Sequence, residues 1–187
     1  MKLHGSYTSP YVRHCRIAMR DAGLAFEFIE TDNGQSARQS PTQRVPFLDI
    51  DGLRLTDSTS ILRWVREHQG RPFLADPGAF DRYLMVNTAM DAAVNLFLLE
   101  RDGLRPEDVP YLARQRDRVR TILEALDLRF QAVGLDGDDG LRLACFLSWA
   151  MFRDRADPTG YGTLGGVLEH WDARPEFAAT HPGLPGR

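Results

Sequence analysis

The chain has 187 residues, of which 43% are hydrophobic and 26% charged, and its formal net charge is -3. No tract is polar enough to predict disorder, and a weakly acidic chain lacks the positive field that gathers nucleic acid. These values exclude a disordered or nucleic-acid-binding protein and leave room for two small domains.

The first 70 residues alternate between strand and helix patterns. Residues 2–5 predict a short strand, residues 10–22 carry helical spacing that ends at Gly23, and residues 25–31 are rich in aromatic and β-branched side chains. Residues 32–42 carry neither period, so we expect a loop there. This part of the chain therefore predicts a β-α-β order followed by a loop.

A hairpin and a third helix complete this half of the chain. Asp51-Gly52 separates the strand patterns of residues 45–50 and 53–55, and this dipeptide favours a tight hairpin turn. Asp57-Ser58 then supplies helix-capping side chains for an apolar pattern that runs to Gly70. The full predicted order is β-α-β, loop, β-β-α.

The segment 71–78 holds two prolines and a glycine, and we place the domain boundary there. Beyond it only helical patterns occur. The sequence therefore predicts a first domain over 1–70, a linker over 71–78 and an all-helical domain over 79–187. The expected helices cover residues 79–101, residues 106–134 starting near Pro106, residues 141–155, and two shorter segments at 164–174 and 175–180.

Ser9 stands directly before Pro10, where the first strand gives way to the first helix. Serine at an N-cap followed by proline at the next position is a typical helix start. The hydroxyl can simply cap its own helix, and in isolation that is the commoner role. Alternatively, the helix N-terminus stabilises an external anion while the Ser9 hydroxyl donates a hydrogen bond to it.

Two further segments have the same double interpretation. Val45-Pro46 can be an ordinary strand entry, or a cis peptide that turns the Val45 backbone outward to pair with an extended peptide. Asp57-Ser58 can merely cap a helix, or the helix N-terminus can bind a ligand carboxylate while Asp57 holds an ammonium group. Together the three segments describe one ligand, an extended peptide with an amino-acid head group and a reactive anion. Glutathione has these parts.

The order of these motifs resembles the cytosolic glutathione S-transferase superfamily. The Gly-Ser-x-x-Ser-Pro-x-Val-Arg opening is similar to its serine-type members, and to the bacterial YibF-like branch in particular. The C-terminal Trp171, Arg174-Pro175, Phe177 and Thr180 resemble the family's Trp…Arg-Pro-x-Phe-x-x-Thr segment. The resemblance implies an α/β thioredoxin-like domain followed by an all-α domain.

The resemblance also implies roles for individual residues. Ser9 donates a hydrogen bond to the glutathione sulfur and favours its thiolate, the effective nucleophile. Val45 pairs its backbone with the cysteinyl unit beside a cis Pro46. The γ-glutamyl end is held by Asp57 and Ser58, and the glycyl carboxylate by Gln43 or Arg44.

The function implied by the resemblance is transfer of glutathione to a small electrophile in detoxification, by a homodimer that needs no metal. The alternatives are a non-catalytic glutathione-binding or interaction module and a glutathione-dependent peroxidase or isomerase. Tyr7 and Tyr11 are candidates for lining the ligand cleft, and some classes of the family use a tyrosine where we favour Ser9. A helix face with Tyr83 and Met90 is a further candidate, either for the electrophile site or for the core.

The two cysteines give no sign of a disulfide framework or a zinc site. Cys15 and Cys145 are far apart and form no CxxC motif. We interpret Cys15 as a core residue because it falls on the buried face predicted for the first helix. No stretch approaches the roughly 20 apolar residues that span a bilayer, and the N-terminus lacks the apolar run of a signal peptide. We expect a cytoplasmic protein without a membrane partner.

Overall fold

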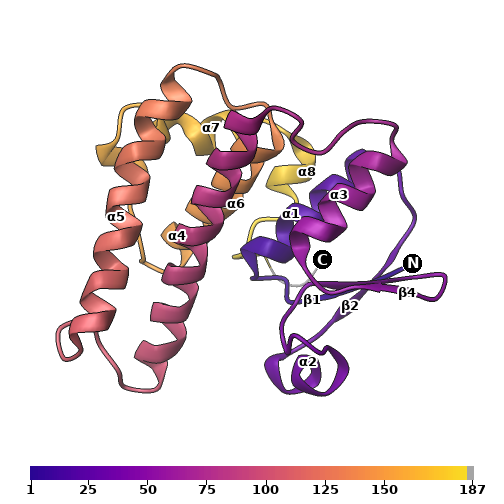
Figure 1. Cartoon of the computed structure of the whole chain (residues 1–187), viewed down its shortest axis with the longest axis horizontal. Helices are drawn as coiled ribbons and strands as arrows, with labels where there is room; N and C mark the ends of the chain where they lie inside the picture. The colour runs from indigo at the N-terminus through magenta and orange to yellow at the C-terminus, as the bar shows by residue number, and fades with distance from the viewer. Residues whose placement is uncertain (185–187) are drawn as a thin grey trace. The chain divides into compact units, whose positions relative to one another are not determined.

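The structure, a computed structural model, describes residues 1–184 and divides into two compact units (Figure 1). The first unit comprises Met1–Phe73 together with the chain from Trp171 onward, and the second comprises Leu74–His170. The division falls inside the predicted linker at 71–78. It differs from the predicted helical domain over 79–187 because α8, Pro175–Ala178, packs against α1 of the first unit.

The first unit contains a four-stranded sheet in the order β2-β1-β3-β4. Strand β1, Lys2–Gly5, pairs parallel with β2, Glu27–Glu30, and antiparallel with β3, Phe47–Ile50. Strand β4, Leu53–Leu55, completes the antiparallel hairpin with β3. Its turn residues have positive φ at Asp51 (41°) and Gly52 (86°), as a two-residue hairpin turn requires. The Asp-Gly hairpin prediction is confirmed.

Helices cover both faces of this sheet. Figure 1 shows α1, Pro10–Asp21, and α3, Ser58–His68, on one face, and α2, Asn33–Gln39, on the other. The last residue of β1 must be small for α1 to approach, since a Cβ on Gly5 would lie 2.5 Å from Cγ1 of Val12. This close approach places Val12, in the first turn of α1, against the last residue of β1.

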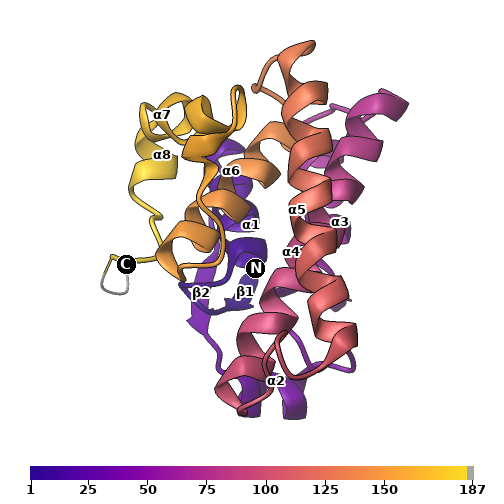
Figure 2. The same cartoon turned by 90° about the vertical axis from the view of Figure 1, so that its left-hand side faces the viewer.

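The second unit is helical. Helix α4, Pro77–Arg101, packs against α5, Pro110–Gln131, and α6, Asp138–Phe152, and Figure 2 shows α4 and α5 side by side. Nearly all of α6 is buried, which confirms the predicted central helix. The remaining elements are the 3-10 turns η1, Pro158–Gly160, and η2, Leu164–Gly166, and α7, Val167–Asp172, which runs across the division between the units. Within residues 1–184, no helix has the length and apolar character needed to cross a membrane.

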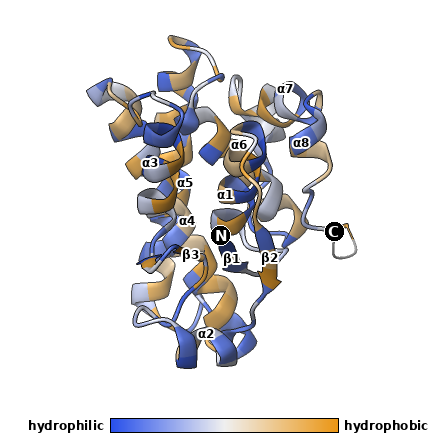
Figure 3. Cartoon of the chain, turned by 90° about the vertical axis from the view of Figure 1, so that its right-hand side faces the viewer, coloured by the Kyte–Doolittle hydropathy of each residue, from blue (hydrophilic) through white to orange (hydrophobic). Residues whose placement is uncertain are grey.

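The predicted loop over 32–42 is wrong, because α2 occupies most of it. Its sequence, Asn-Gly-Gln-Ser-Ala-Arg-Gln, is mostly hydrophilic, and its single apolar side chain, Ala37, makes no apolar period (Figure 3). The helix is instead specified at its start by a capping box: the Asp32 carboxylate accepts from the Gln35 N–H at 2.7 Å, and the Gln35 side chain accepts from the Asp32 N–H at 2.9 Å. The Asp-x-x-Gln spacing was the signal that could have predicted α2.

Two predicted helix starts also differ from the structure. Helix α5 begins at Pro110, which occupies its first turn, so the expected start near Pro106 is a turn of the connecting loop. The helix expected over residues 141–155 begins earlier, at Asp138, and ends at Phe152. In α6 the N-cap is Gly137, with no side-chain cap bond, and Asp139 instead pairs with Arg82 at 2.7 Å.

The apolar face predicted for residues 79–101 belongs mainly to the core of the helical unit. Tyr83 and Met90 are fully buried. Phe97 is half-buried and meets Trp149 edge-on at 5.9 Å between ring centroids. Helical periodicity alone could not make this distinction, since a buried face and a ligand-lining face repeat at the same spacing.

Candidate functional site

Ser9 occupies the N-cap of α1, as predicted. Its side-chain oxygen accepts a hydrogen bond from the Val12 N–H at 3.4 Å, and its carbonyl accepts from the Arg13 N–H at 3.0 Å. This N···O distance is longer than the roughly 2.7–3.2 Å that is usual for an N–H···O hydrogen bond. Ser9 is also only half-buried. Its hydroxyl is therefore weakly engaged, next to a helix N-terminus that favours negative charge.

The start of α3 provides a second helix N-terminus in the same unit. Asp57 is the N-cap and its carboxylate accepts from the Thr59 N–H at 2.7 Å. Ser58, the first residue of the helix, is 4% exposed. Asp57 itself is exposed, so a ligand cation can approach its carboxylate.

Cys15 connects the two helices that begin at these caps. The prediction that it is a core residue is confirmed, because Cys15 is 0% exposed. Its thiol donates a weak hydrogen bond to the Ser58 carbonyl, with sulfur and oxygen 3.8 Å apart. Cys15 thus fixes α1 against the first residue of α3, and its burial makes it a structural rather than a reactive thiol.

The Val45–Pro46 peptide bond is cis. Val45 is half-buried and precedes β3, so its backbone N–H and C=O lie outside the pairing of the sheet. Arg44 and Gln43 are exposed. The three predicted features therefore all occur in the structure as local geometry.

Gln43 has a left-handed backbone that the sequence did not indicate. Its φ is 54°, its N–H donates to the Ser40 carbonyl at 2.9 Å, and its carbonyl accepts from the Ser36 hydroxyl at 3.3 Å. A left-handed conformation costs a residue with a side chain about 1–2 kcal/mol. The turn after α2 maintains this conformation and sets where the Gln43 and Arg44 side chains leave the backbone.

Tyr7 packs against other side chains of the first unit. Its ring lies 4.6 Å from that of Phe28, and the Arg16 guanidinium sits 4.8 Å from the Tyr7 ring centroid. Burial lowers the pKa of Arg16 to about 10, so the guanidinium stays charged at neutral pH. Tyr7 and Tyr11 are both half-buried. One face of the Tyr7 ring is thus in contact with a cation.

Arg13 joins the two terminal motifs that carried the family resemblance. It is 1% exposed, and its guanidinium lies 3.7 Å from the Phe177 ring centroid. One terminal nitrogen donates to the Phe177 carbonyl at 2.7 Å, and Nε donates to the Thr180 hydroxyl at 3.1 Å. Sequence reasoning identified both segments but not this contact, since no local pattern relates residues so far apart.

A polar network on β1, β3 and β4 was also missed. The His4 ring stacks on Phe47 at 4.2 Å between centroids, and its Nε2 lies 3.3 Å from the Asp49 carboxylate. Burial is the main cause that lowers the pKa of His4. The hydrogen bond from Arg54 lowers the pKa of Asp49. This network supports the strand that follows Pro46. Among residues 1–184, His, Cys, Asp and Glu side chains form no group of three that could hold a metal ion.

The family model described as glutathione S-transferase, N-terminal domain, matches residues 3–73. This range includes Ser9, Val45–Pro46 and Asp57–Ser58. Residues 3–73 thus carry this family's N-terminal domain, and the chain as a whole is similar to members of the glutathione S-transferase superfamily. The uncharacterised glutathione S-transferase-like protein YibF of Escherichia coli K12 is 29% identical, and the match covers 97% of this chain and 98% of YibF. Glutathione S-transferase 4 of Zea mays is 24% identical over 97% of this chain and 89% of its own length.

Solved transferase structures have the same architecture. A glutathione S-transferase from Methylobacterium radiotolerans in complex with glutathione sulfonate is 25% identical, with a TM-score of 0.83 over 100% of this chain and 96% of that chain. One from Methylobacillus flagellatus with bound glutathione is 21% identical, with a TM-score of 0.85 over 97% and 98%. The predicted thioredoxin-like domain followed by a helical domain is confirmed.

Proposed function

We propose that this protein is a glutathione transferase in which Ser9 activates the thiol of bound glutathione. One observation carries the proposal: Ser9 caps the helix that follows β1, in a chain with a transferase N-terminal domain. The similar Methylobacterium and Methylobacillus transferases hold glutathione sulfonate and glutathione, which supports glutathione as the ligand. A non-catalytic binding module or another glutathione-dependent activity is not favoured by these comparisons.

Glutathione fits the chemistry of the three segments. The γ-glutamyl carboxylate accepts hydrogen bonds at the N-terminus of α3 near Ser58, and its ammonium group pairs with the exposed Asp57 carboxylate. The backbone of Val45 pairs with the cysteinyl unit, as a strand pairs with an extended peptide. The glycyl carboxylate is held by Gln43 or Arg44, both of which are exposed.

The Ser9 hydroxyl donates to the glutathione sulfur, and the α1 N-terminus adds its partial positive charge. A free thiol has a pKa of about 8.5, so it is mostly protonated at neutral pH. Stabilising the thiolate therefore raises the fraction of glutathione that is present as the nucleophile. With an aryl halide, the thiol proton leaves to solvent, a carbon–sulfur bond forms, and the carbon–halogen bond breaks to release halide. We infer a small electrophile of this kind as the second substrate.

Turnover of chlorodinitrobenzene with glutathione tests the proposal. We expect Ser9→Ala to lower kcat/KM about 100-fold, the typical effect of removing one donor to a developing anion. Ser6→Ala is the matched control, since Ser6 shares the turn and contacts Thr8 instead of capping α1. Equal turnover by Ser9→Ala and the parent would refute the role of Ser9, and absence of glutathione binding at millimolar concentration would refute the whole proposal.

The physiological setting is part of the proposal. We infer a cytoplasmic homodimer that acts in detoxification, because the family resemblance points to that assembly and role. Sedimentation velocity of the purified chain tests the assembly: a mass near twice that of the chain agrees with a dimer, and a single-chain mass over the working concentration range contradicts it.

A further inference from the structure

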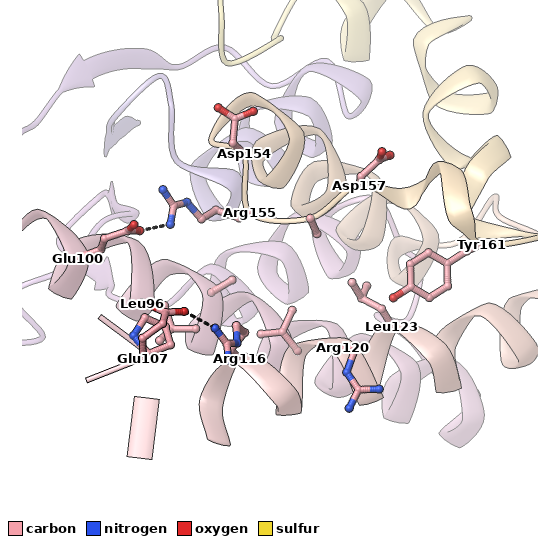
Figure 4. A pocket seen from close by; sticks show the side chains of 14 residues that line it. Leu96, Glu100, Glu107, Arg116, Arg120, Leu123, Asp154, Arg155, Asp157 and Tyr161 are labelled. Atoms are coloured by element: carbon pink, nitrogen blue, oxygen red, sulfur yellow. Dashed lines mark hydrogen bonds and ion pairs between the residues drawn. The ribbon is translucent and has the colours of Figure 1, made fainter. Parts of the chain in front are cut away.

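The helical unit contains a cavity of about 390 Å³ near the end of α4, the start of α5 and the segment after α6 (Figure 4). All of its lining residues lie between Ala93 and Tyr161, within the second unit. None of the residues proposed to bind glutathione belongs to this lining. The volume falls within the roughly 300–1,000 Å³ of small-molecule sites.

The floor of the cavity is apolar. It is formed by Ala93 and Leu96 of α4 and by Val119 and Leu123 of α5. Ala93, Val119 and Leu123 are 4%, 7% and 2% exposed, so their positions are fixed by the packing of the two helices. Such a floor suits an aromatic ring, which loses contact with water when it binds there.

One end of the cavity is charged but neutralised. Arg116 pairs with Glu107 at 2.5 Å, and Arg155 pairs with Glu100, as the dashed lines in Figure 4 mark. Each cation here faces its own carboxylate. This end therefore offers no net charge to a ligand.

Arg120 and Tyr161 supply hydrogen-bond donors to the lining. The partner of Arg120 is Glu124, one helical turn away at 2.9 Å, and Glu124 is not part of the lining. Both side chains of this pair are more than half exposed, and exposed pairs of this spacing contribute little, so Arg120 can turn to a ligand. Burial raises the pKa of Tyr161, which keeps its hydroxyl protonated, and Figure 4 shows this hydroxyl directed toward Leu123.

The carboxylates of Asp154 and Asp157 also belong to the lining, but they point away from Arg120. Asp157 accepts a hydrogen bond from the Thr159 N–H at 2.9 Å and so caps the following turn. Figure 4 shows the carboxylates of Asp154 and Asp157 pointing to the side opposite Arg120. These two carboxylates therefore do not compete for the Tyr161 hydroxyl, and the Arg120 guanidinium, which Figure 4 shows directed away from Leu123, reaches an anion beside Tyr161 by rotating inward.

We propose that this cavity binds an aromatic monocarboxylate. The ring lies on the floor of Leu96, Val119 and Leu123, and the carboxylate accepts hydrogen bonds from Arg120 and Tyr161. This inference does not depend on the proposed transferase activity, because it rests on the helical unit alone.

Calorimetric titration of the full chain with 2-naphthoate tests the proposal, with 2-naphthylmethylamine as the cationic counterpart. We expect naphthoate to bind, and the amine to bind at least about tenfold more weakly because it cannot accept from Arg120. Arg120→Gln should weaken naphthoate binding about tenfold or more, as expected for loss of a hydrogen bond to a charged group. Tyr161→Phe should weaken it several-fold. Arg114→Gln, an exposed arginine of α5 outside the lining, should leave it unchanged.

The titration is repeated with saturating S-hexylglutathione, which fills the glutathione site. Unchanged naphthoate affinity agrees with a separate cavity, and competition overturns the proposal. Equal affinity of Arg120→Gln and the parent, equal affinity for the amine, or no naphthoate binding at millimolar concentration would each overturn it too. If S-hexylglutathione itself does not bind, the proposed transferase function fails while the naphthoate result still decides this inference.

Discussion

Arg13 and Thr180, 167 residues apart in the sequence, are joined by a buried hydrogen bond of 3.1 Å from the guanidinium Nε to the threonine hydroxyl oxygen. The Thr180 hydroxyl in turn donates to the Phe177 carbonyl at 3.0 Å, the same carbonyl that accepts from Arg13. Arg13 stands one turn after Ser9, and its N–H donates to the Ser9 carbonyl. The C-terminal segment thus holds the first turn of α1, on which Ser9 is the cap.

Thr180→Val should lower the free energy of unfolding of the first unit by about 1–3 kcal/mol, because it leaves a buried guanidinium N–H without its acceptor. Thr180→Ser should retain most of the stability. Chemical denaturation followed by circular dichroism measures the effect. Thr88→Val is the matched control, since Thr88 is exposed on α4, and a Thr180→Val protein as stable as this control would contradict the contact's contribution.

Two substitutions at Gln43 distinguish the energetic cost of its left-handed backbone from the role of its side chain. Gln43→Gly should be as stable as the parent or up to about 1 kcal/mol more stable, because glycine adopts positive φ without steric cost. Gln43→Ala should have about the same stability as the parent, because alanine also has a Cβ and retains the cost of a positive φ. If the Gln43 side chain holds the glycyl carboxylate, both variants raise KM for glutathione several-fold and to the same extent. An unchanged KM in both would move that contact to Arg44, which Arg44→Gln then tests.

Stability should fall as the pH drops below about 6.5, the ordinary pKa of histidine. The pKa of His4 is lowered in the folded protein, mainly by burial and against the attraction of Asp49, so its neutral form is the one that folding favours. Its contribution is present above the unfolded pKa and is lost as pH falls through the folded pKa. Arg54 and Lys2 also disfavour the protonated ring.

Denaturation of the parent and His4→Gln at pH 7.5 and at pH 5.5 measures this contribution. We expect the loss of stability between the two pH values to be smaller in His4→Gln. It should not vanish, because burial also lowers the pKa of His181. His68→Gln, at an exposed position of α3, is the control, and an equal pH effect in all three proteins would show that His4 does not contribute.

The local chemistry of the chain predicted much of the site. The capping side chains of Ser9-Pro10 and Asp57-Ser58 predict two helix starts, and Asp51-Gly52 predicts a hairpin turn. These elements could therefore be placed from short windows of sequence. Helix α2 could not be predicted from periodicity, because Ala37 is the single apolar side chain among its seven residues. The capping box of Asp32 and Gln35 is the sequence feature that marks the start of α2.

What the sequence could not predict depends on packing between distant segments. The burial of Arg13 against Phe177 follows from the return of the chain to α1, and an arginine in a helix pattern gives no sign of it. Tyr83 and Phe97 share one helical face, yet one is fully buried and the other half-exposed. The positive φ of Gln43 results from the turn after α2 and has no glycine or asparagine to mark it.

The central claim is that Ser9 stabilises the thiolate of bound glutathione, and the pH titration of thiolate absorbance in the glutathione complex tests it most directly. The parent should ionise the bound thiol at a pH at least about one unit below the 8.5 of a free thiol. Ser9→Ala should bind glutathione with a thiol pKa returned toward the free value. The same depressed pKa in both proteins would contradict the account.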